Sequence, residues 1–164
     1  MCLASILISP RTDPSVLEIL CKELGFQPLV FGAADRNGQA IYHTNVMMCI
    51  GNHFVIICSE AIRNVKERRK LLDSFQQAKL HVVEISFEQM YAFAGNMIQL
   101  KGNTSRDLLV MSGTAYRSLL PEQLAELKKS IIPVVADIPV IEESGGGSTR
   151  CMIAGIFLSR ITKE

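Results

Sequence analysis

The sequence predicts an α/β fold built from a repeated unit of strand, strand, helix and strand. Apolar runs typical of strands alternate along the chain with segments whose apolar residues recur at helical spacing. Two stretches, NVMMCIGN at residues 45–52 and NMIQLKGN at residues 96–103, begin and end on the same residues and lie 51 positions apart. A repeat of this size indicates a solenoid, an array or a closed ring.

The first part of the chain, residues 1–34, supplies the last three elements of such a unit. LASILIS predicts a strand, and the helix-start signal TDPS precedes VLEILCKEL, whose apolar residues have helical spacing. This helix is expected to end at Gly25, and PLVFGA predicts the second strand. The dipeptide Asn37-Gly38 then marks a turn.

Two complete units are expected next, over residues 39–86 and 92–138. In the first, IYHTNVMMCIG and HFVIICS predict strands, residues 61–77 a helix and HVVEIS a strand. In the second, AGNMIQLKGN and DLLVMS predict strands, residues 121–129 a helix and PVVAD a strand. Residues 145–158, with CMIAGIFL, begin another unit. We therefore expect one domain over residues 1–164, about two and a half units long, whose open strand edges need covering.

The composition describes a folded domain with few charged features. The chain has 164 residues, 48% of them hydrophobic, and a net charge of +1, so neither nucleic acid nor a membrane is expected as a partner. The basic run KERRK is typical of a solvated helix face. No apolar run approaches the roughly eighteen residues of a membrane span, and the first residues lack a secretory signal, so we expect a cytoplasmic protein.

Five cysteines occupy irregular positions, without a CxxC pair or a histidine and cysteine cluster at metal-ligand spacing. We therefore expect no disulfide framework, no metal and no cofactor. Cys151 differs from the others because it follows the glycine-rich stretch GGGSTR. It is either a small buried hydrophobe that opens a strand or a reactive thiol delivered by the loop.

The segments IYHTNVMMCIG, FAGNMIQL and GGGSTRCMIAGIFL resemble the guanidino-group-modifying enzymes, the pentein superfamily of arginine deiminases, dimethylargininases and amidinotransferases. Within it, the chain looks most similar to bacterial arginine-deiminase-related hydrolases, which include amidinotransferase-like and citrulline-utilisation proteins. The resemblance extends over essentially the whole chain but covers only the C-terminal half of such an enzyme. It implies a five-bladed α/β propeller of ββαβ units, of which this chain would form about half.

The resemblance implies that Cys151 is a nucleophile and His43 the general acid and base. In this superfamily, the cysteine attacks the guanidinium carbon and water releases the product from a covalent thiouronium intermediate. A guanidinium carbon is a poor electrophile, so the reaction needs a thiolate and a proton donor for the leaving nitrogen. Arg150 and the N–H groups of residues 145–147 are expected to stabilise the thiolate.

The residues around His43 and Cys151 bear on the substrate. Strand alternation would place His43 and Asn45 on one face, although a lone histidine beside a turn is also a common surface residue. Asn45 stands where related enzymes carry aspartate, which favours a ureido or otherwise less cationic substrate, or charge recognition by another carboxylate. Gly146 and Gly147 would let backbone approach the ligand. Arg150 either binds a carboxylate of the substrate or is a surface residue without a role in binding.

Three functional interpretations remain open at the level of sequence. The chain is part of a hydrolase acting on C–N bonds of a small guanidino or ureido compound, with the remaining site groups in an N-terminal half. Alternatively, it is an inactive half-propeller that acts as a structural or self-associating module. A homodimer with a new site at its joint is a third interpretation. Asn96, the repeat partner of Asn45, is expected to be structural.

Overall fold

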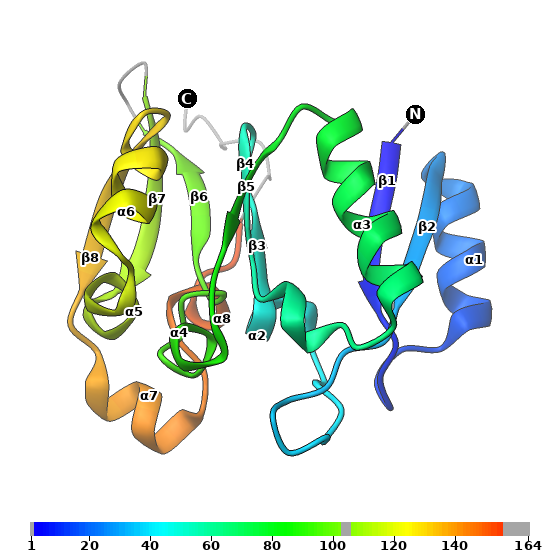
Figure 1. Cartoon of the computed structure of the whole chain (residues 1–164), viewed down its shortest axis with the longest axis horizontal. Coiled ribbons are helices and arrows are strands. Elements are labelled where there is room, and N and C mark those ends of the chain that lie inside the picture. The colour runs from blue at the N-terminus through cyan, green and yellow to red at the C-terminus, as the bar shows by residue number, and fades with distance from the viewer. Residues whose placement is uncertain (1, 103–105, 156–164) are drawn as a thin grey trace, which may run out of the picture.

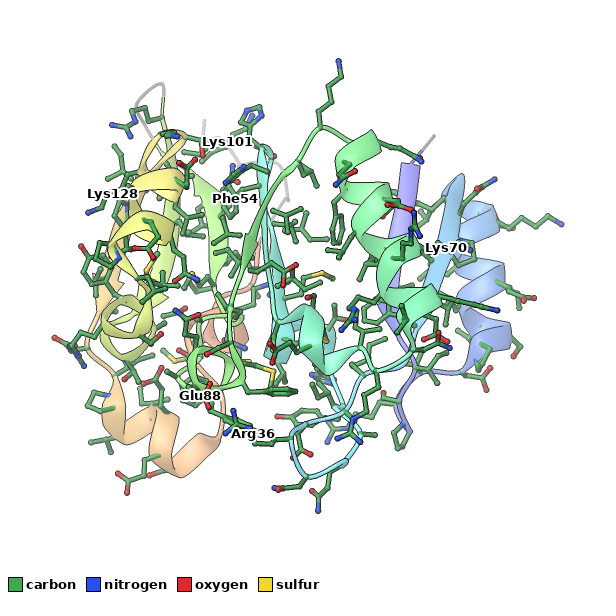
Figure 2. All side chains as sticks on the ribbon, in the orientation of Figure 1. Arg36, Phe54, Lys70, Glu88, Lys101 and Lys128 are labelled. Atoms are coloured by element: carbon green, nitrogen blue, oxygen red, sulfur yellow. The ribbon has the colours of Figure 1, made fainter. Side chains whose placement is uncertain are left out.

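The computed structural model describes residues 2–102 and 106–155, which form three small sheets with helices beside them (Figure 1). The sheets follow one another along the chain. Each was expected from the apolar runs, and together they give the mixed α/β architecture that the sequence predicts. Charged side chains such as Lys70 and Lys128 lie on the outside (Figure 2).

The first sheet contains β1 (Cys2–Leu7) and β2 (Phe26–Phe31), which pair in parallel. They are joined by α1 (Pro14–Glu23). This helix begins at Asp13, whose carboxylate accepts two backbone N–H groups of the first turn, and a proline occupies the first helical position. The helix-start signal therefore acts as the sequence predicts.

The second sheet has the strand order β3 (Met48–Ile50), β4 (Phe54–Ile57) and β5 (His81–Glu84). The first pair is antiparallel and the second pair parallel. After a short 3₁₀ turn at Ser59–Ala61, α3 (Val65–Gln77) crosses from β4 to β5. This is the predicted order of strand, strand, helix and strand.

The third sheet repeats this arrangement with β6 (Ile98–Lys101), β7 (Asp107–Ser112) and β8 (Ile131–Ala136). Again the first pair is antiparallel and the second parallel. The crossover contains two helices, α5 (Gly113–Ser118) and α6 (Pro121–Lys128). The first sheet contains only the parallel pair, so it corresponds to the last two strands of the other sheets.

The prediction of one long strand over IYHTNVMMCIG is wrong for the first half of that segment. Only β3 is a strand there, because Thr44–Met47 form a single helical turn, α2, with His43 at its N-terminal cap. Met47, Met48 and Cys49 are all buried, so the apolar pattern does not distinguish a strand from a buried turn. His43 and Asn45 therefore do not alternate along one strand face.

The prediction of a strand from Cys151 onward is also wrong at the start of that segment. Thr149–Met152 form another helical turn, α8, which contains Cys151. The later part of the predicted strand, from residue 156, lies outside the described residues. The turns α2 and α8 have related sequences, TNVM and TRCM, so Asn45 corresponds to Arg150 and Val46 to Cys151.

Two other short helices border the later sheets. They are α4 (Phe87–Tyr91) and α7 (Pro139–Gly145), neither of which the sequence analysis predicts. Helices this short show too few turns for a helical period. Their start signals are present in the sequence nevertheless. Ser86 and Gln89 form a capping box for α4, and α7 begins with a proline.

The crossover helices α3 and α6 each also contact the last strand of the preceding sheet. At the end of β2, the Gly32 N–H donates to the Glu67 carboxylate of α3 over 2.8 Å. Gln123 of α6 donates to the Glu84 carbonyl of β5 over 2.6 Å. The helices therefore join neighbouring sheets around one apolar core, whose largest buried side chains include Phe31, Met47, Ile56, Leu71, Leu109 and Leu127.

In the described ranges, no helix has the length and apolar character to cross a membrane.

Candidate active site

Side chains from α2, α4, α8 and the loop before β6 surround a cavity of about 260 Å³. The cavity brings together four of the residues that the sequence predicts as site residues: His43, Asn45, Gly146 and Cys151. Segments more than a hundred residues apart thus meet at one place. The full lining is Tyr42, His43, Asn45, Val46, Met90, Tyr91, Phe93, Asn96, Gly146 and Cys151.

Cys151 presents its thiol to this cavity between two amide groups. The side-chain N–H of Asn96 donates to the Cys151 Sγ over 3.2 Å, and that of Asn45 over 3.6 Å. The turn that carries Cys151 is anchored by buried Thr149, whose hydroxyl donates to the Asn96 carbonyl over 3.0 Å. The sulfur is therefore held at a defined position and faces hydrogen-bond donors.

Exposure separates Cys151 from three other cysteines of the chain. Cys21, Cys49 and Cys58 are buried, whereas Cys151 is exposed. Burial raises the pKa of Cys49 to about 12 and that of Cys58 to about 11, because an apolar environment disfavours the thiolate. The structure therefore excludes the interpretation of Cys151 as a buried core residue, and the three buried cysteines have that role instead.

His43 lies at the start of α2 with its ring exposed. Arg11, from the loop after β1, approaches the His43 Nε2 with its Nη1 at 3.4 Å. A guanidinium only donates hydrogen bonds, so this contact is a hydrogen bond only in the tautomer in which Nε2 carries a lone pair.

Buried polar contacts hold the glycine-rich loop that precedes Cys151. The Ser148 hydroxyl donates to the Glu142 carboxylate over 2.6 Å, and both side chains are buried. Gly146 ends α7 in the left-handed region, with φ of 64°. A Cβ on Gly147 would lie 3.2 Å from both the Cβ and the Sγ of Cys151. Gly147 therefore makes room for the thiol, although it does not line the cavity itself.

A second pocket of about 280 Å³ adjoins the first and contains Arg150. Both pockets share Tyr42, His43 and Asn45. The second adds two guanidinium groups, those of Arg11 and Arg150, and its described lining contains no acidic side chain. Sequence reasoning missed Arg11, because SPRTDP after a strand indicates only a helix start.

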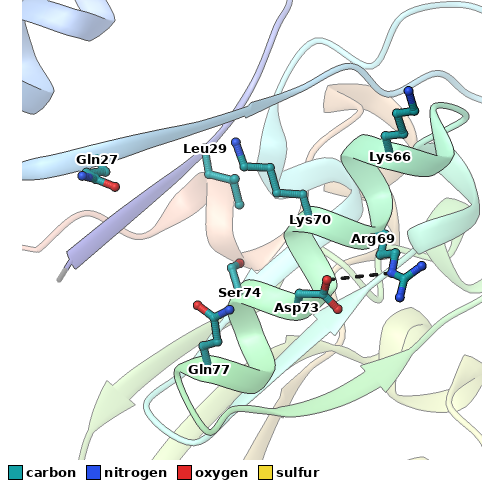
Figure 3. Close-up of a pocket in the computed structure, with 8 residues that line it drawn as sticks. All are labelled: Gln27, Leu29, Lys66, Arg69, Lys70, Asp73, Ser74 and Gln77. Atoms are coloured by element: carbon teal, nitrogen blue, oxygen red, sulfur yellow. Dashed lines mark ion pairs between the residues drawn. The ribbon is translucent and has the colours of Figure 1, made fainter.

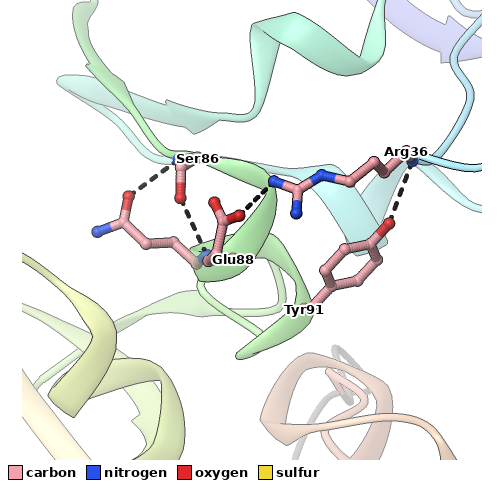
Figure 4. Close-up of polar contacts among 5 residues, drawn as sticks. Arg36, Ser86, Glu88 and Tyr91 are labelled. Carbon is pink, nitrogen blue, oxygen red and sulfur yellow. Dashed lines mark hydrogen bonds and ion pairs between the residues drawn. The ribbon is translucent and has the colours of Figure 1, made fainter.

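A polar contact fixes the wall of the cavity that α4 provides. The guanidinium of Arg36 pairs with the carboxylate of Glu88, and the Arg36 backbone N–H donates to the Tyr91 hydroxyl over 3.1 Å (Figure 4). The hydrogen bond from Arg36 lowers the pKa of Glu88 to about 2. Since Tyr91 lines the cavity, the turn that contains Arg36 is tied to the candidate site.

The described lining of the cavity contains no carboxylate, and its walls are partly aromatic. Phe93 stands out because it adopts a positive φ of 64°, which is uncommon for a bulky residue and costs conformational energy. Together with Tyr42 and Tyr91, Phe93 offers a ring for a cation. The described residues also contain no group of three or more potential metal ligands.

A larger depression of about 470 Å³ lies between β2 and α3, and Cys151 is not part of its lining (Figure 3). Its lining comprises Gln27, Leu29, Lys66, Arg69, Lys70, Asp73, Ser74 and Gln77. Arg69 and Asp73 form a long ion pair there, at 4.0 Å. These residues include neither a cysteine nor a histidine, so the smaller cavity remains the candidate site.

Comparisons with solved structures find the same fold. The apo structure of ArgZ, an arginine dihydrolase from the ornithine–ammonia cycle in cyanobacteria, matches with a TM-score of 0.65 at 14% identity, over 92% of this chain and 21% of that one. The N-terminal domain of ArgZ matches with a TM-score of 0.66 at 13% identity in its substrate-bound form, over 90% of this chain and 48% of that domain. The chain thus spans about half of that domain.

Sequence comparisons identify the family. No curated protein sequence matches significantly. The model of the family described as "N,N dimethylarginine dimethylhydrolase, eukaryotic" matches residues 3–158, which is nearly the whole chain. This confirms the resemblance to guanidino-group-modifying enzymes of the pentein superfamily. The chain therefore belongs to the eukaryotic N,N-dimethylarginine dimethylhydrolase family.

Proposed function

We propose that this chain supplies the nucleophile and the general acid and base of a hydrolase that cleaves a C–N bond in an arginine-like guanidino or ureido compound. The observation that carries the proposal is the exposed Cys151 sulfur, which faces two amide donors in a cavity shared with His43. Membership in a family named for dimethylarginine hydrolysis supports the same class of chemistry.

The first proposed step forms a covalent intermediate. The Cys151 thiolate attacks the guanidinium carbon, a C–S bond forms, and the C=N electron pair moves to nitrogen. The tetrahedral species then collapses as protonated His43 gives a proton to the leaving nitrogen, and the C–N bond breaks to release ammonia or an amine. What remains on the sulfur is a thiouronium group, and His43 is neutral again.

The second proposed step consumes water. His43 accepts a proton from the water as its oxygen bonds to the thiouronium carbon, and the C–S bond then breaks with its electron pair returning to sulfur. The remaining hydroxyl proton passes to the released ammonia or amine, or to solvent, as the C=O bond forms. The products are a ureido compound and the regenerated thiolate.

The two adjoining pockets support a substrate with two different ends. The guanidino end would lie in the cavity against aromatic rings, which attract cations, and against Val46 and Met90, which suit carbon substituents on nitrogen. A carboxylate at the other end would bind Arg11 and Arg150 in the second pocket. Asn45 lies between them and would hydrogen-bond to a guanidino or ureido nitrogen or oxygen without charge pairing.

The repeat supports a further proposal about assembly, namely that the units form part of a propeller completed by a second copy of the chain. Both α3 and α6 lie between their own sheet and the last strand of the preceding sheet. The equivalent helix α1 buries Leu17 and Cys21 against the first sheet but leaves a second apolar face exposed. That face contains Val16, Ile19, Leu20 and Leu24.

A matching surface lies at the other end of the chain. The strand β8 is the last strand of its sheet, and its side chains Ile132 and Val134 are partly exposed. By analogy with the contacts of α3 with β2 and of α6 with β5, α1 of one copy would pack on β8 of the other. Two copies would then provide about five units, as the resemblance to a five-bladed propeller requires. The alternative function, a self-associating module without activity, rests on the same surfaces.

The test of the proposed activity is release of ammonia or amine by the purified chain. The substrates are arginine, citrulline, agmatine and methylated arginines, and the controls are Cys151→Ala and His43→Ala. We expect release by the wild-type chain and at least a ~10³-fold loss in Cys151→Ala, because the remaining site groups do little alone. Release that persists in Cys151→Ala contradicts the mechanism, and a dimer that releases nothing from any substrate favours the module.

A further inference from the structure

Asn96 lies at the centre of the candidate site, where it contacts both α2 and α8. Its side chain is 3% exposed. We propose that Asn96 is a positioning residue that orients the Cys151 sulfur and favours its thiolate form by donating a hydrogen bond. This role goes beyond the structural one that the sequence predicts, and it rests on the proposed function only in that Cys151 is the nucleophile.

Two backbone groups of opposite polarity fix the orientation of the Asn96 amide. Its Oδ1 accepts the backbone N–H of Arg150 over 3.1 Å, which only an oxygen can do. Its Nδ2 donates to the backbone carbonyl of Asn45 over 3.1 Å, which only the NH₂ group can do. A flipped amide would face a donor with a donor and an acceptor with an acceptor. The group near the sulfur is therefore the NH₂.

The second hydrogen of that NH₂ group is available to donate a hydrogen bond to the sulfur. One N–H is directed at the Asn45 carbonyl, and the Nδ2 lies 3.2 Å from the Cys151 Sγ. A thiolate accepts hydrogen bonds much more strongly than a thiol, so a fixed donor stabilises the charged form. Asn96 is buried although Cys151 is exposed, so the amide is held in place on the protein side of the sulfur.

The same residue also sets where the sulfur lies. The Asn96 backbone carbonyl accepts the hydroxyl of Thr149, at the first position of α8, over 3.0 Å. Asn96 therefore contacts the helical turn on the N-terminal side of Cys151 and the sulfur itself. Asn45 donates to the same sulfur from 3.6 Å, but its side chain is only half-buried. The geometry thus makes Asn96 the stronger of the two donors.

The test is the pH dependence of Cys151 alkylation, which needs no turnover. Iodoacetamide labelling is followed at Cys151 by peptide mass spectrometry in the wild-type chain, Asn96→Ala and Asn96→Asp. We expect labelling at pH 7 to be about tenfold slower in Asn96→Ala, and the pH midpoint of the rate to move upward, because the donor that favours the thiolate is lost. Asn96→Asp should move it further, because a carboxylate oxygen replaces the donor.

Gln89→Ala is the matched control, since Gln89 is another buried amide with structural hydrogen bonds, to the Ser118 carbonyl and Gln123. It should lower stability and leave the midpoint unchanged. Circular dichroism checks that each variant is folded, and so does the continued protection of Cys49 and Cys58 from alkylation. Should both Asn96 variants unfold, Asn96→Ser provides a smaller change, and its midpoint should still rise.

Folded Asn96 variants with the wild-type midpoint would overturn the proposal. The outcome is separable from that of the proposed function. A shifted midpoint without ammonia release supports the role of Asn96 and counts against the activity. Cys151-dependent ammonia release with an unshifted midpoint supports the activity and leaves Asn96 a merely structural residue.

Discussion

At the residue scale, burial separates the exposed thiol of Cys151 from the buried thiols of Cys21, Cys49 and Cys58. We expect iodoacetamide at pH 8 to label Cys151 in the folded chain and to leave Cys49 and Cys58 unmodified. The buried thiols have pKa values raised to about 12 and about 11, so almost no thiolate forms in either. Peptide mass spectrometry measures the labelling.

Denatured protein is the control for this labelling and should be modified at all three positions. Modification of Cys49 or Cys58 in the folded chain, at a rate equal to that of Cys151, would contradict the burial that the structure shows.

The glycines before Cys151 provide a matched pair of substitutions. Gly147→Ala should slow alkylation of Cys151 about tenfold, because the added methyl would lie 3.2 Å from the Cys151 Cβ and Sγ and would displace the thiol. Gly145→Ala should have no effect, since a Cβ there meets nothing within 4 Å. Alkylation rates of the two variants check this, and equal rates would show that the thiol does not depend on the space at Gly147.

Sequence reasoning singled out Cys151 and His43, which the structure places in one cavity, but it did not predict the contacts around them. Cys151 and His43 were predicted because their types and neighbouring residues resemble a known family. The sulfur contact of Asn96 was not predicted, because it joins positions 55 residues apart and an asparagine beside a glycine is common in turns. Arg11 was missed for the same reason, since its partner His43 is 32 residues away.

At the element scale, the contact between α7 and α8 depends on one buried carboxylate. Ser148→Ala would remove the hydroxyl that donates to Glu142, which is 5% exposed. We expect the free energy of unfolding to fall by about 1–3 kcal/mol, since a buried acceptor loses its partner. Urea denaturation measures this.

The double variant Glu142→Gln/Ser148→Ala tests the cause of that loss. A neutral amide costs less to bury than a carboxylate without a partner, so part of the lost stability should return. A double variant no more stable than Ser148→Ala would show that the charge of Glu142 is not responsible.

The contact of the Arg36 turn with α4 should depend on pH. Glu88 titrates near its ordinary value of 4.5 in the unfolded chain and near 2 in the folded one, because of Arg36. The pair therefore contributes stability above pH 4.5 and loses it as the pH falls toward 2. Thermal unfolding of the wild-type chain and Glu88→Gln should differ slightly at pH 7, because the pair is exposed, and should converge by pH 2. A difference that is constant with pH would contradict this.

The elements that the sequence predicted correctly are those with enough residues to show a pattern. Most strands of the three sheets produce apolar runs, and α1 and α3 show helical spacing. The turns α2 and α8 could not be predicted in this way, because a four-residue helix beside a buried strand has the same apolar content as the strand. These two turns carry the site, so the fold was easier to predict than the geometry of its chemistry.

At the scale of the whole molecule, the exposed faces of α1 and β8 predict self-association. We expect sedimentation to show a dimer and Ile19→Lys to raise its dissociation constant at least ~tenfold, because a charge would be buried at the interface. Val134→Lys on β8 should have the same effect. Val65→Lys is the control, because Val65 is as exposed as Ile19 but lies at the start of α3.

A compact wild-type monomer at high concentration would contradict this assembly. Equal weakening by the control variant would show that added charge alone, and not the proposed surface, controls association.

The correspondence between α2 and α8 bears on how this chemistry arose. The turns TNVM and TRCM share their length, their first and last residues and their place next to Asn96. If both turns descend from one duplicated segment, duplication produced two copies of the same position. One copy could then change its side chain while the other kept the residue that the fold needs. In that history, Val46 and Cys151 occupy equivalent positions, one with an apolar side chain and the other with an exposed thiol. Val46→Cys would place a cysteine at the equivalent position, and its alkylation rate compared with that of Cys151 would show how much of the thiol's reactivity depends on the position itself.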